Sequence, residues 1–311
     1  MTTSEYVGID VAKAELVVST PTASLGRYGN DAKGHCDLVK RLGRMQVAGV
    51  VLESTGRYGQ DVAVALMAAG FSVAMVQPGR VRHFARSLGV RAKSDPIDAQ
   101  VIAKFGEATK PRPMSPMPSE ITQLRALVDR RDQVVELRKQ EQNHLEACTA
   151  PIIVKDLRSS IARLEKSEAR YTADIARHLA AHEQLHRLSQ ALQTESGVAT
   201  LTAATLIAHL PELGRINRQQ VAALSGLAPY DHSSGTQDGK RSIAGGRKRL
   251  RRALYMAAIT AARFSTWLAP MYLRLLERGK CKKVAIIACA RKLLIRLNSI
   301  AAKALATPTP A

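Results

Sequence analysis

Aromatic residues are scarce in this 311-residue chain, where Phe, Trp and Tyr together make up 4%. Single-stranded nucleic acids are commonly held by stacking on such side chains, so stacking is not expected as the main binding mode. Long apolar runs are also missing. The run VAIIACA at 284–290 stops at Arg291 and Lys292, well short of a bilayer span. The first residues, MTTSEYVGID, enter a strand without a charged-then-apolar leader, so we expect a cytoplasmic protein with no membrane partner.

Cysteine is rare too, and the four that occur are scattered: Cys36, Cys148, Cys281 and Cys289. None forms a CxxC pair, so we expect reduced, mostly buried thiols rather than disulfides or a zinc site. Three histidines, His178, His182 and His186, are spaced i, i+4, i+8 and are predicted to share one helical face. No cysteine or carboxylate clearly completes a tetrahedral ligand set with them. A solvated helix face is therefore favoured over a metal site.

Acidic residues are few relative to basic ones. The chain has 46 Lys and Arg against 26 Asp and Glu, a formal net charge of +20 and a pI near 10.2. A globular protein with this charge repels itself unless it meets a polyanion. Nucleic acid is the leading candidate partner, and an anionic membrane surface is second. The length allows two domains, and a hydrophobic content of 46% allows substantial cores.

The first third of the chain alternates strand and helix patterns. Apolar runs bounded by turn residues predict strands at 5–10, 14–20, 47–52 and 71–76. Helical spacing and turn signals predict helices over 31–44, 59–69 and 79–88. The run VAGVVL at 47–52 is apolar throughout, as expected for a strand covered on both faces. This alternation predicts an α/β layer architecture.

The segment KSDPIDAQ at 93–100 carries two carboxylates at the start of a predicted helix. Asp95 precedes Pro96 and is placed as the N-cap, with proline at the first helical position. Asp98 then falls at the third helical position, so both acids lie on the first turn and can face the same point. A cap and an acid that complements the helix dipole explain the segment equally well without any function.

Two further acids end predicted strands: Asp10 ends the first strand, and Glu53 ends the strand at 47–52. Asp10, Glu53, Asp95 and Asp98 could not all lie close together as anions without a cation, because like charges raise one another's pKa. Mg²⁺ prefers a few carboxylates together with water and phosphate. Two such ions could clamp the attacking and leaving oxygens of a phosphoryl displacement. The acids at these element ends therefore point to a magnesium centre.

The middle of the chain is predicted to be helical. It begins after a stiff linker marked by Pro111, Pro113, Pro116 and Pro118. Apolar residues at helical spacing predict one long helix from Ser119 to Leu145 and a second from about Ile152 to Leu192. Two such amphipathic helices indicate a hairpin. It either packs within one chain or makes a coiled-coil contact with a second copy, and we favour the second arrangement.

Basic residues concentrate in the last third of the chain, where residues 240–296 contain 16 Lys or Arg and one acid, Glu277. The stretch DHSSGTQDGKRSIAGGRKRLRR at 231–252 presents two serines among glycines, followed by cations that open a helix. A helix N-terminus attracts phosphate. A Ser233 or Ser234 hydroxyl is the candidate attacking group, and His232 is a weaker candidate for its base. The alternatives are a turn-forming loop and a solvated basic face.

Ten of these cations are expected to contact nucleic acid: Lys240, Arg241, Arg247, Lys248, Arg249, Arg251, Arg252, Lys280, Lys282 and Lys283. Contacts of this kind bind backbone phosphate and give steep salt dependence rather than sequence readout.

Three short motifs, GID at 8–10, LESTGRYG at 52–59 and KSDPIDAQ at 93–100, precede the basic block GLAPYDHSSGTQDGKRSIAGGRKRLRR. In this order they resemble the signatures of the DEDD-type insertion-sequence transposases, the insertion-sequence one-ten family. The resemblance covers most of the chain and is weakest between about 112 and 190. One departure is Gly197-Val198-Ala199, where relatives often carry a Gly-apolar-Gly hairpin that clamps phosphate.

The resemblance implies a site and a chemistry. Asp10, Glu53, Asp95 and Asp98 match the metal-binding tetrad, and Ser234 matches the nucleophile. Such enzymes cut and rejoin DNA through a covalent phosphoserine, with Mg²⁺ as cofactor. Relatives pair a structured bridge RNA with donor and target DNA. They act as homo-oligomers, dimers or tetramers, so the serine of one chain can meet the tetrad of another.

The resemblance also implies three parts. Residues 1–110 form an α/β RuvC-like domain of the ribonuclease H fold that carries the tetrad. Residues 111–192 form a linker and a long helical hairpin or coiled coil. Residues 193–311 form a basic, mostly α transposase domain that carries the serine.

Two alternatives stay open at this point. A RuvC-like structure-specific nuclease would use the tetrad without a serine intermediate, and its Ser234→Ala variant would still cut. A non-enzymatic basic nucleic-acid-binding protein would behave as wild type after Asp10→Ala. A recombinase would lose strand exchange with either substitution and keep its nucleic-acid binding.

Overall fold

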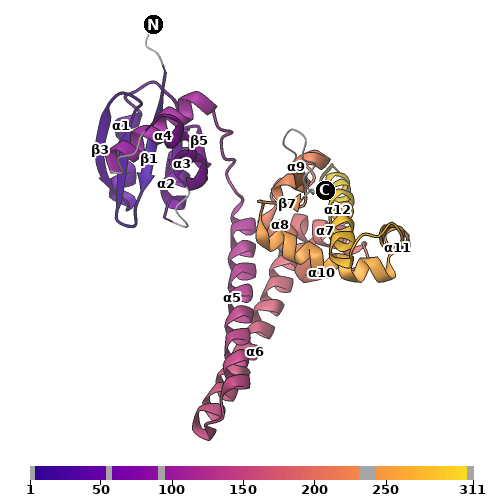
Figure 1. Ribbon diagram of the computed structural model, residues 1–311. Coiled ribbons are helices and arrows are strands. Elements are labelled where there is room, and N and C mark those ends of the chain that lie inside the picture. The colour runs from indigo at the N-terminus through magenta and orange to yellow at the C-terminus, as the bar shows by residue number, and fades with distance from the viewer. Residues whose placement is uncertain (1–3, 54–57, 90–94, 231–241, 307–311) are drawn as a thin grey trace. The chain divides into compact units, whose positions relative to one another are not determined.

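The computed structural model describes residues 4–53, 58–89, 95–230 and 242–306, and the chain divides into two compact units (Figure 1). The first unit comprises Met1–Pro116 and the second Met117–Ala311. The apolar clusters of the first unit lie on the two faces of a sheet, whereas the second unit is built around one large helical core.

A five-stranded mixed sheet forms the centre of the first unit, in the order β3-β2-β1-β4-β5. The strands are β1 (Glu5–Val11), β2 (Glu15–Ser19), β3 (Ser24–Gly29), β4 (Val47–Glu53) and β5 (Val73–Val76). β1 is antiparallel to β2 and parallel to β4, and β4 is parallel to β5. The four predicted strands are confirmed. The sequence does not predict β3, because SLGRYG lies at the sheet edge, is largely exposed and lacks an apolar alternation.

Helices cover both faces of this sheet: α1 (Ala32–Leu42), α2 (Gln60–Ala68), α3 (Pro78–Ser87) and α4 (Asp95–Thr109). α1 and α2 pack on the face that contains Ile9 and Leu52. α3 and α4 pack on the opposite face, around Val51. β4 is therefore covered on both sides, as its uniformly apolar sequence predicts. These layers confirm the α/β architecture of the N-terminal part.

The proline-rich segment between Thr109 and Ser119 contains no helix or strand. Its backbone is anchored at one point, where the N–H of Met114 donates to Val73 O at 2.7 Å. The anchor lies at the end of the sheet order, on β5, which has a single neighbouring strand in the sheet.

The second unit begins with two long helices, α5 (Ser119–Ala147) and α6 (Pro151–Ala181), which pack against each other as a hairpin (Figure 1). The prediction of one helix from Ile152 to Leu192 is wrong. The backbone is extended at His182 (φ −121°, ψ 105°), and a separate helix, α7 (Glu183–Gln193), follows. The break allows the apolar face of α7 to join the C-terminal core. His186 therefore lies on a different helix from His178, and the predicted common face of the three histidines is not formed.

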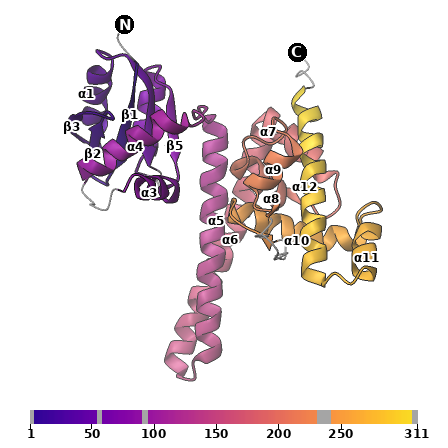
Figure 2. The ribbon, with the colours of Figure 1, turned by 45° about the horizontal axis from the view of Figure 1, so that its top comes forward.

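The C-terminal part of the second unit is a helical bundle around one core. Its elements are α8 (Thr200–His209), α9 (Arg218–Leu224), β6 (Pro229–Tyr230), β7 (Ser242–Ile243), α10 (Lys248–Phe264), α11 (Ala269–Glu277) and α12 (Lys282–Ala306). Leu124 of α5 and Ile175 of α6 are fully buried in the same core, so the base of the hairpin belongs to the bundle (Figure 2). The mostly helical C-terminal part is confirmed. Within the described ranges, no helix has the length and apolar character needed to cross a membrane.

The four cysteines are free thiols, as predicted. The expectation that most of them are buried is wrong, because Cys36 and Cys281 are exposed and Cys148 is half-buried at the end of α5. Cys289 alone among them lies in the helical core, and burial raises its pKa to about 11. It therefore stays a protonated thiol at neutral pH.

Candidate active centre and nucleic-acid interface

Asp10 and Glu53 come to the same edge and the same face of the sheet. β1 and β4 are parallel, and Ile9 is paired with Leu52, so the next residues along the two strands are Asp10 and Glu53. Side chains alternate between the two faces along a strand. Since Ile9 and Leu52 both pack under α1 and α2, the two carboxylates belong to the face that α4 covers.

A glycine allows α4 to lie directly on β1. A Cβ atom at Gly8 would collide with Ala99 O and Ala103 N on the helix backbone. Any residue with a side chain would therefore push the helix away from the strand that carries Asp10. The close packing of α4 on β1 therefore depends on Gly8 of the GID motif, two residues before Asp10.

The direction of α4 brings its first turn toward the carboxylates. Gly8 lies against Ala99 and Ala103, whereas Tyr6, nearer the start of β1, lies against Gly106. The helix therefore runs antiparallel to β1, and its N-terminal end lies toward Asp10.

That N-terminal end carries the other two predicted acids. The helix is described from Asp95 onward, and the residues before it lie outside the described ranges, so the N-cap role of Asp95 stays a prediction. Pro96 is the second described residue of the helix. A backbone N–H at that position would have no intrahelical acceptor, so proline, which lacks the N–H, costs no hydrogen bond there. Asp98 is half-buried and lies one turn further along.

The residue types at this edge suit a hard cation, because two strands and the first turn of α4 bring Asp residues and one Glu toward the same end of the sheet. Among the side chains that the structure describes, which include Asp10, Glu53 and Asp98, no group of three or more His, Cys, Asp or Glu is gathered into a metal set. The side chain of Asp95 and residues 54–57 and 90–94 lie outside that description. Carboxylate oxygens are ligands that Mg²⁺ prefers, so the chemistry of Asp10 and Glu53 fits this ion.

The candidate nucleophile lies outside the described residues. Ser234 falls within 231–241, as do His232, Ser233, Lys240 and Arg241. The ends of that segment are described. β6 and β7 pair antiparallel, with Pro229 opposite Ile243 and Tyr230 opposite Ser242. The segment that carries the serine is therefore closed at its base by a two-stranded ribbon.

Arg251 and two glycines hold the chain next to this ribbon. Gly226 and Gly246 have φ angles of 66° and 67°, and a Cβ on Gly246 would collide with the backbone of Gly226. The Arg251 guanidinium donates to Gly245 O at 2.8 Å and to Gly226 O at 3.3 Å. A residue predicted to bind phosphate therefore braces the two turns that flank the ribbon.

Arg247 also has a partner within the protein. It donates from its two terminal nitrogens to the two oxygens of Glu212, at 2.7 Å each, and to His209 O at 2.9 Å. Burial alone would raise the pKa of Glu212, but the hydrogen bonds and charge of Arg247 outweigh it, and the pKa is lowered. This bidentate pair joins the end of α8 to the start of α10.

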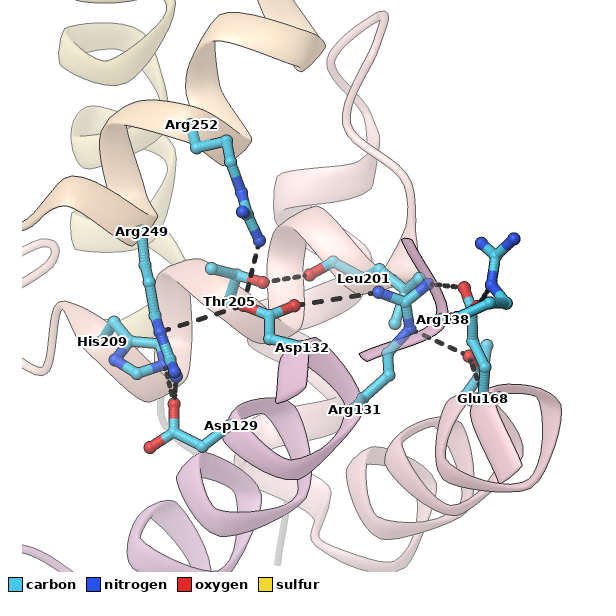
Figure 3. A network of polar contacts seen from close by, with 11 residues as sticks. Asp129, Arg131, Asp132, Arg138, Glu168, Leu201, Thr205, His209, Arg249 and Arg252 are labelled. Carbon is cyan, nitrogen blue, oxygen red and sulfur yellow. Dashed lines mark hydrogen bonds and ion pairs between the residues drawn. The ribbon is translucent and has the colours of Figure 1, made fainter. Parts of the chain in front are cut away.

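Arg249 and Arg252 face acids of α5 (Figure 3). Arg249 forms an ion pair with Asp129 and lies 3.9 Å from Asp132, and Arg252 lies 3.6 Å from Asp132. Asp132 also lies 3.8 Å from Arg131, which donates to Glu168 of α6 at 2.8 Å. A continuous row of alternating charges therefore runs from α6 through α5 to the first turns of α10.

His209 lies within this row and is neutral at pH 7. Burial lowers its pKa to about 4, together with the charge of Arg125 and against the opposing charge of Asp132. Its Nε2 lies 3.1 Å from Asp129 Oδ1. Protonated His209 would therefore be a buried cation close to Arg125 and Arg247.

The predicted cations thus divide by residue type. The described arginines Arg247, Arg249, Arg251 and Arg252 contact acids or carbonyls of the second unit. The described lysines are exposed, namely Lys248, Lys280, Lys282 and Lys283, and so is Arg252. Sequence reasoning did not identify the acidic partners Asp129, Asp132 and Glu212. The i, i+3 spacing of Asp129 and Asp132 shows that they share a helical face, but no sequence signal says that α10 covers it.

Two family models match this chain. A transposase model of the DEDD, IS110 type matches residues 7–154. A model described as a transposase of the IS116/IS110/IS902 family matches residues 189–273. The first match covers the sheet with Asp10 and Glu53, and the second covers Ser234 and α10.

Curated relatives extend the similarity over nearly the whole length. The pilin gene-inverting proteins of Moraxella bovis and Moraxella lacunata are each 28% identical over 302 residues, which is 93% of this chain and 93% of each relative. The insertion element IS110 uncharacterized 43.6 kDa protein of Streptomyces coelicolor is 30% identical over 146 residues, 46% of this chain and 35% of the relative.

The α/β unit with its acidic edge, the basic helical unit and these matches define a DNA transposase, an enzyme that recombines DNA. Within that class, the chain belongs to the IS110 family of insertion-sequence transposases. The resemblance expected from the three acidic motifs and the basic block is confirmed.

Proposed function

We propose that this transposase cuts and rejoins DNA through a covalent phosphoserine at Ser234, with Asp10, Glu53, Asp95 and Asp98 as its Mg²⁺-binding set. The observation that carries the proposal is the pairing of Ile9 with Leu52, which makes Asp10 and Glu53 neighbours on the α4 face. The antiparallel course of α4 supports adding its two acids to the set.

The first unit is, in this proposal, a RuvC-like domain of the ribonuclease H fold. The mixed sheet with order β3-β2-β1-β4-β5 and carboxylates at the ends of two central parallel strands supports it. Residues 1–110 supply the carboxylates, 111–192 the linker and the helical hairpin, and 193–311 the serine and the basic surface.

The chemistry exchanges one phosphate ester for another. Ser234 Oγ forms a bond to phosphorus while the bond from phosphorus to a deoxyribose oxygen breaks, and the serine proton passes to the departing oxygen or to solvent. A deoxyribose hydroxyl of the new partner strand then attacks the phosphoserine, releasing Ser234 and restoring a phosphodiester. The ester is retained throughout, so rejoining needs no ATP.

The carboxylates and the ribbon have separate tasks in this scheme. When bound, Mg²⁺ would offset negative charge on the phosphate and lower the pKa of the attacking hydroxyl. Asp10, Glu53, Asp95 and Asp98 keep that positive charge at the sheet edge. Arg251 holds the turns that flank the ribbon, and so holds the base of the segment that carries Ser234.

Exposed lysines carry the contact with nucleic-acid backbones. Lys248, Lys280, Lys282 and Lys283 attract phosphate but cannot by themselves read bases. We assign sequence choice to a structured bridge RNA that pairs with donor and target DNA. We assign the hairpin of α5 and α6 to contacts with a second copy, in an active dimer or tetramer that works in the cytoplasm.

The names of two relatives suggest which rearrangement results. Both Moraxella proteins are named for inverting a pilin gene. The same strand exchange inverts a segment when both sites lie in opposite orientation on one DNA molecule, and inserts it when they lie on two molecules. We expect this chain to support both outcomes, with site arrangement as the deciding factor.

A denaturing gel for a protein–DNA adduct tests the proposal. The full chain is incubated with Mg²⁺ and RNA from its own locus, on plasmid DNA that carries the native flanks of its gene. Wild type should give labelled protein, whereas Ser234→Ala and Asp10→Asn should give none and still bind DNA. Cutting by Ser234→Ala would favour a nuclease without a serine intermediate. Unchanged behaviour of both variants would favour a non-enzymatic binding protein.

A further inference from the structure

One side chain bridges the two loops that follow the acid-bearing strands. Asn30 Nδ2 donates to Ala12 O at 2.9 Å and to Tyr58 O at 3.1 Å. Ala12 directly follows β1, which carries Asp10, and Tyr58 lies between β4 and α2, after Glu53. The amide group of Asn30 therefore links Ala12, which follows β1, to Tyr58, which lies between β4 and α2, at the edge of the sheet where Asp10 and Glu53 lie.

The orientation of Asn30 is set by a buried histidine. Both amide hydrogens face carbonyl oxygens, so Oδ1 is left for His35 Nε2, which lies 2.8 Å away. An amide oxygen only accepts hydrogen bonds, so His35 Nε2 must carry the proton. His35 is only 9% exposed and lies on the first turn of α1, which fixes its ring.

The backbone around Asn30 is held as firmly as its side chain. Asn30 N donates to Ala14 O at 2.9 Å, and the next residue, Asp31, caps α1 by accepting from Gly34 N at 2.8 Å. A Cβ atom at Gly34 would collide with Gly29 O, so the chain is tightly folded at this point. The bridge is therefore anchored to the start of a helix and not to a loose loop.

We propose that Asn30 and His35 are positioning residues, which hold Asp10 and Glu53 at the separation that the metal centre needs. The inference rests on the proposed function of those acids. A cation shared by two carboxylates needs them at one separation, so any spreading of the ends of β1 and β4 would weaken its binding. The Asn30 bridge opposes this without adding a charge, so it does not compete with the cation. Asn30 and His35 act only through the backbone of Ala12 and Tyr58.

The test measures metal affinity separately from stability. Mn²⁺, a paramagnetic substitute for Mg²⁺, is titrated into the full chain without DNA and followed by electron paramagnetic resonance, and Tm is measured in parallel. Asn30→Ala removes the bridge. His35→Phe keeps a buried ring but removes the donor, and His35→Gln restores a donor near the position of Nε2. Mn²⁺ affinity should fall about tenfold for Asn30→Ala and His35→Phe, the low end for groups that support metal ligands. His35→Gln should recover most of it.

Thr20→Val is the matched control. Thr20 is 2% exposed, and its hydroxyl accepts from Ala23 N at 3.1 Å in the turn after β2. The pairing of Gly8 with Ser19 shows that this turn lies toward the start of β1, away from Asp10. The variant should lower Tm, as the bridge variants do, and leave Mn²⁺ affinity unchanged.

Three results would overturn the inference, and they separate it from the proposed function. If Asn30→Ala and His35→Phe bind Mn²⁺ as tightly as Thr20→Val does, while Asp10→Asn loses binding, the bridge is only structural. If Asp10→Asn also binds as wild type does, or wild type binds no Mn²⁺, the acidic centre itself is wrong and the inference falls with it. If Asn30→Ala does not fold, His35→Phe, which leaves the Asn30 side chain in place, decides the question alone.

Discussion

The indole N–H of Trp267 donates to Glu195 Oε2 at 3.0 Å, joining residues 72 positions apart. The other oxygen of Glu195 accepts from Arg296, whose guanidinium lies 4.9 Å from the centre of the Trp267 ring. Glu195 is 6% exposed and lies in the turn between α7 and α8. One buried carboxylate thus ties that turn to the α10–α11 connection and to α12.

Glu195→Gln should lower the free energy of unfolding by about 1–2 kcal/mol, because Arg296 loses its charged partner but remains half exposed. Trp267 is the only tryptophan of the chain, so its fluorescence reports on this contact directly during urea unfolding. Glu277→Gln, at an exposed position on α11, is the control and should stay within about 0.5 kcal/mol of wild type. If the two variants unfold with the same free energy, Glu195 does not stabilise the bundle through Trp267 and Arg296.

Gly8→Ala should separate α4 from β1, because the added methyl group collides with Ala99 O and Ala103 N. Overpacking of this kind typically costs about 1–3 kcal/mol. Adduct formation should be lost, since the first turn of α4 no longer meets Asp10. Both effects can be read from urea unfolding and the adduct gel. Gly79→Ala in α3 is the control, because open space surrounds that position and alanine favours helix. A fully active Gly8→Ala variant would count against the acidic centre.

His209 should make the second unit less stable in mild acid. Its folded pKa is about 4, against an ordinary value of 6.5. Between these values the unfolded chain binds a proton that the folded chain does not, so stability falls as pH drops from 6.5 toward 4. The loss should reach at most about 3 kcal/mol.

The measurement is the free energy of unfolding from urea titrations at pH 7 and pH 4.5. In His209→Gln the free energy of unfolding should differ little between the two pH values. In His186→Gln, changed at an exposed position, it should differ as much as in wild type. The same pH dependence in all three proteins would show that another group is responsible.

Asp129 and Asp132 should weaken non-specific DNA binding, because they hold Arg249 and Arg252 away from phosphate. In Asp129→Asn/Asp132→Asn the two arginines become available. Each new phosphate contact steepens the plot of log affinity against log salt by about 0.9, so the slope should change by about 2. Affinity should be measured by fluorescence anisotropy on random duplex DNA between about 50 and 200 mM salt, where a change of this size in the slope is easily measured.

Asp156→Asn/Glu165→Gln changes the net charge equally at two exposed positions of α6, and is the control for that experiment. It should raise affinity slightly without a new contact, so its slope should stay close to that of wild type. If both double variants show the same slope, the arginines do not exchange α5 carboxylates for phosphate.

Local patterns predicted the elements around the acids well, because strand and helix periodicity is a property of neighbouring residues. The runs at 47–52 and 71–76 became β4 and β5, and Asp10 and Glu53 were placed at strand ends. Elements without such a pattern were missed or merged. β3 is an exposed edge strand. The break at His182 depends on the packing of α7 into the C-terminal core, which is a tertiary contact.

The sequence by itself determined the family, the α/β layers, the acids at element ends and the concentration of positive charge after residue 240. These features depend on short motifs and on composition. Only the tertiary structure decided which cations remain exposed, because Arg247 and Arg249 find Glu212 and Asp129 across 35 and 120 positions of the chain. Ion pairs form between side chains that packing brings within a few ångströms, and no local pattern encodes that distance. The same holds for Asn30, which meets Ala12 and Tyr58 only after the sheet and α1 have assembled.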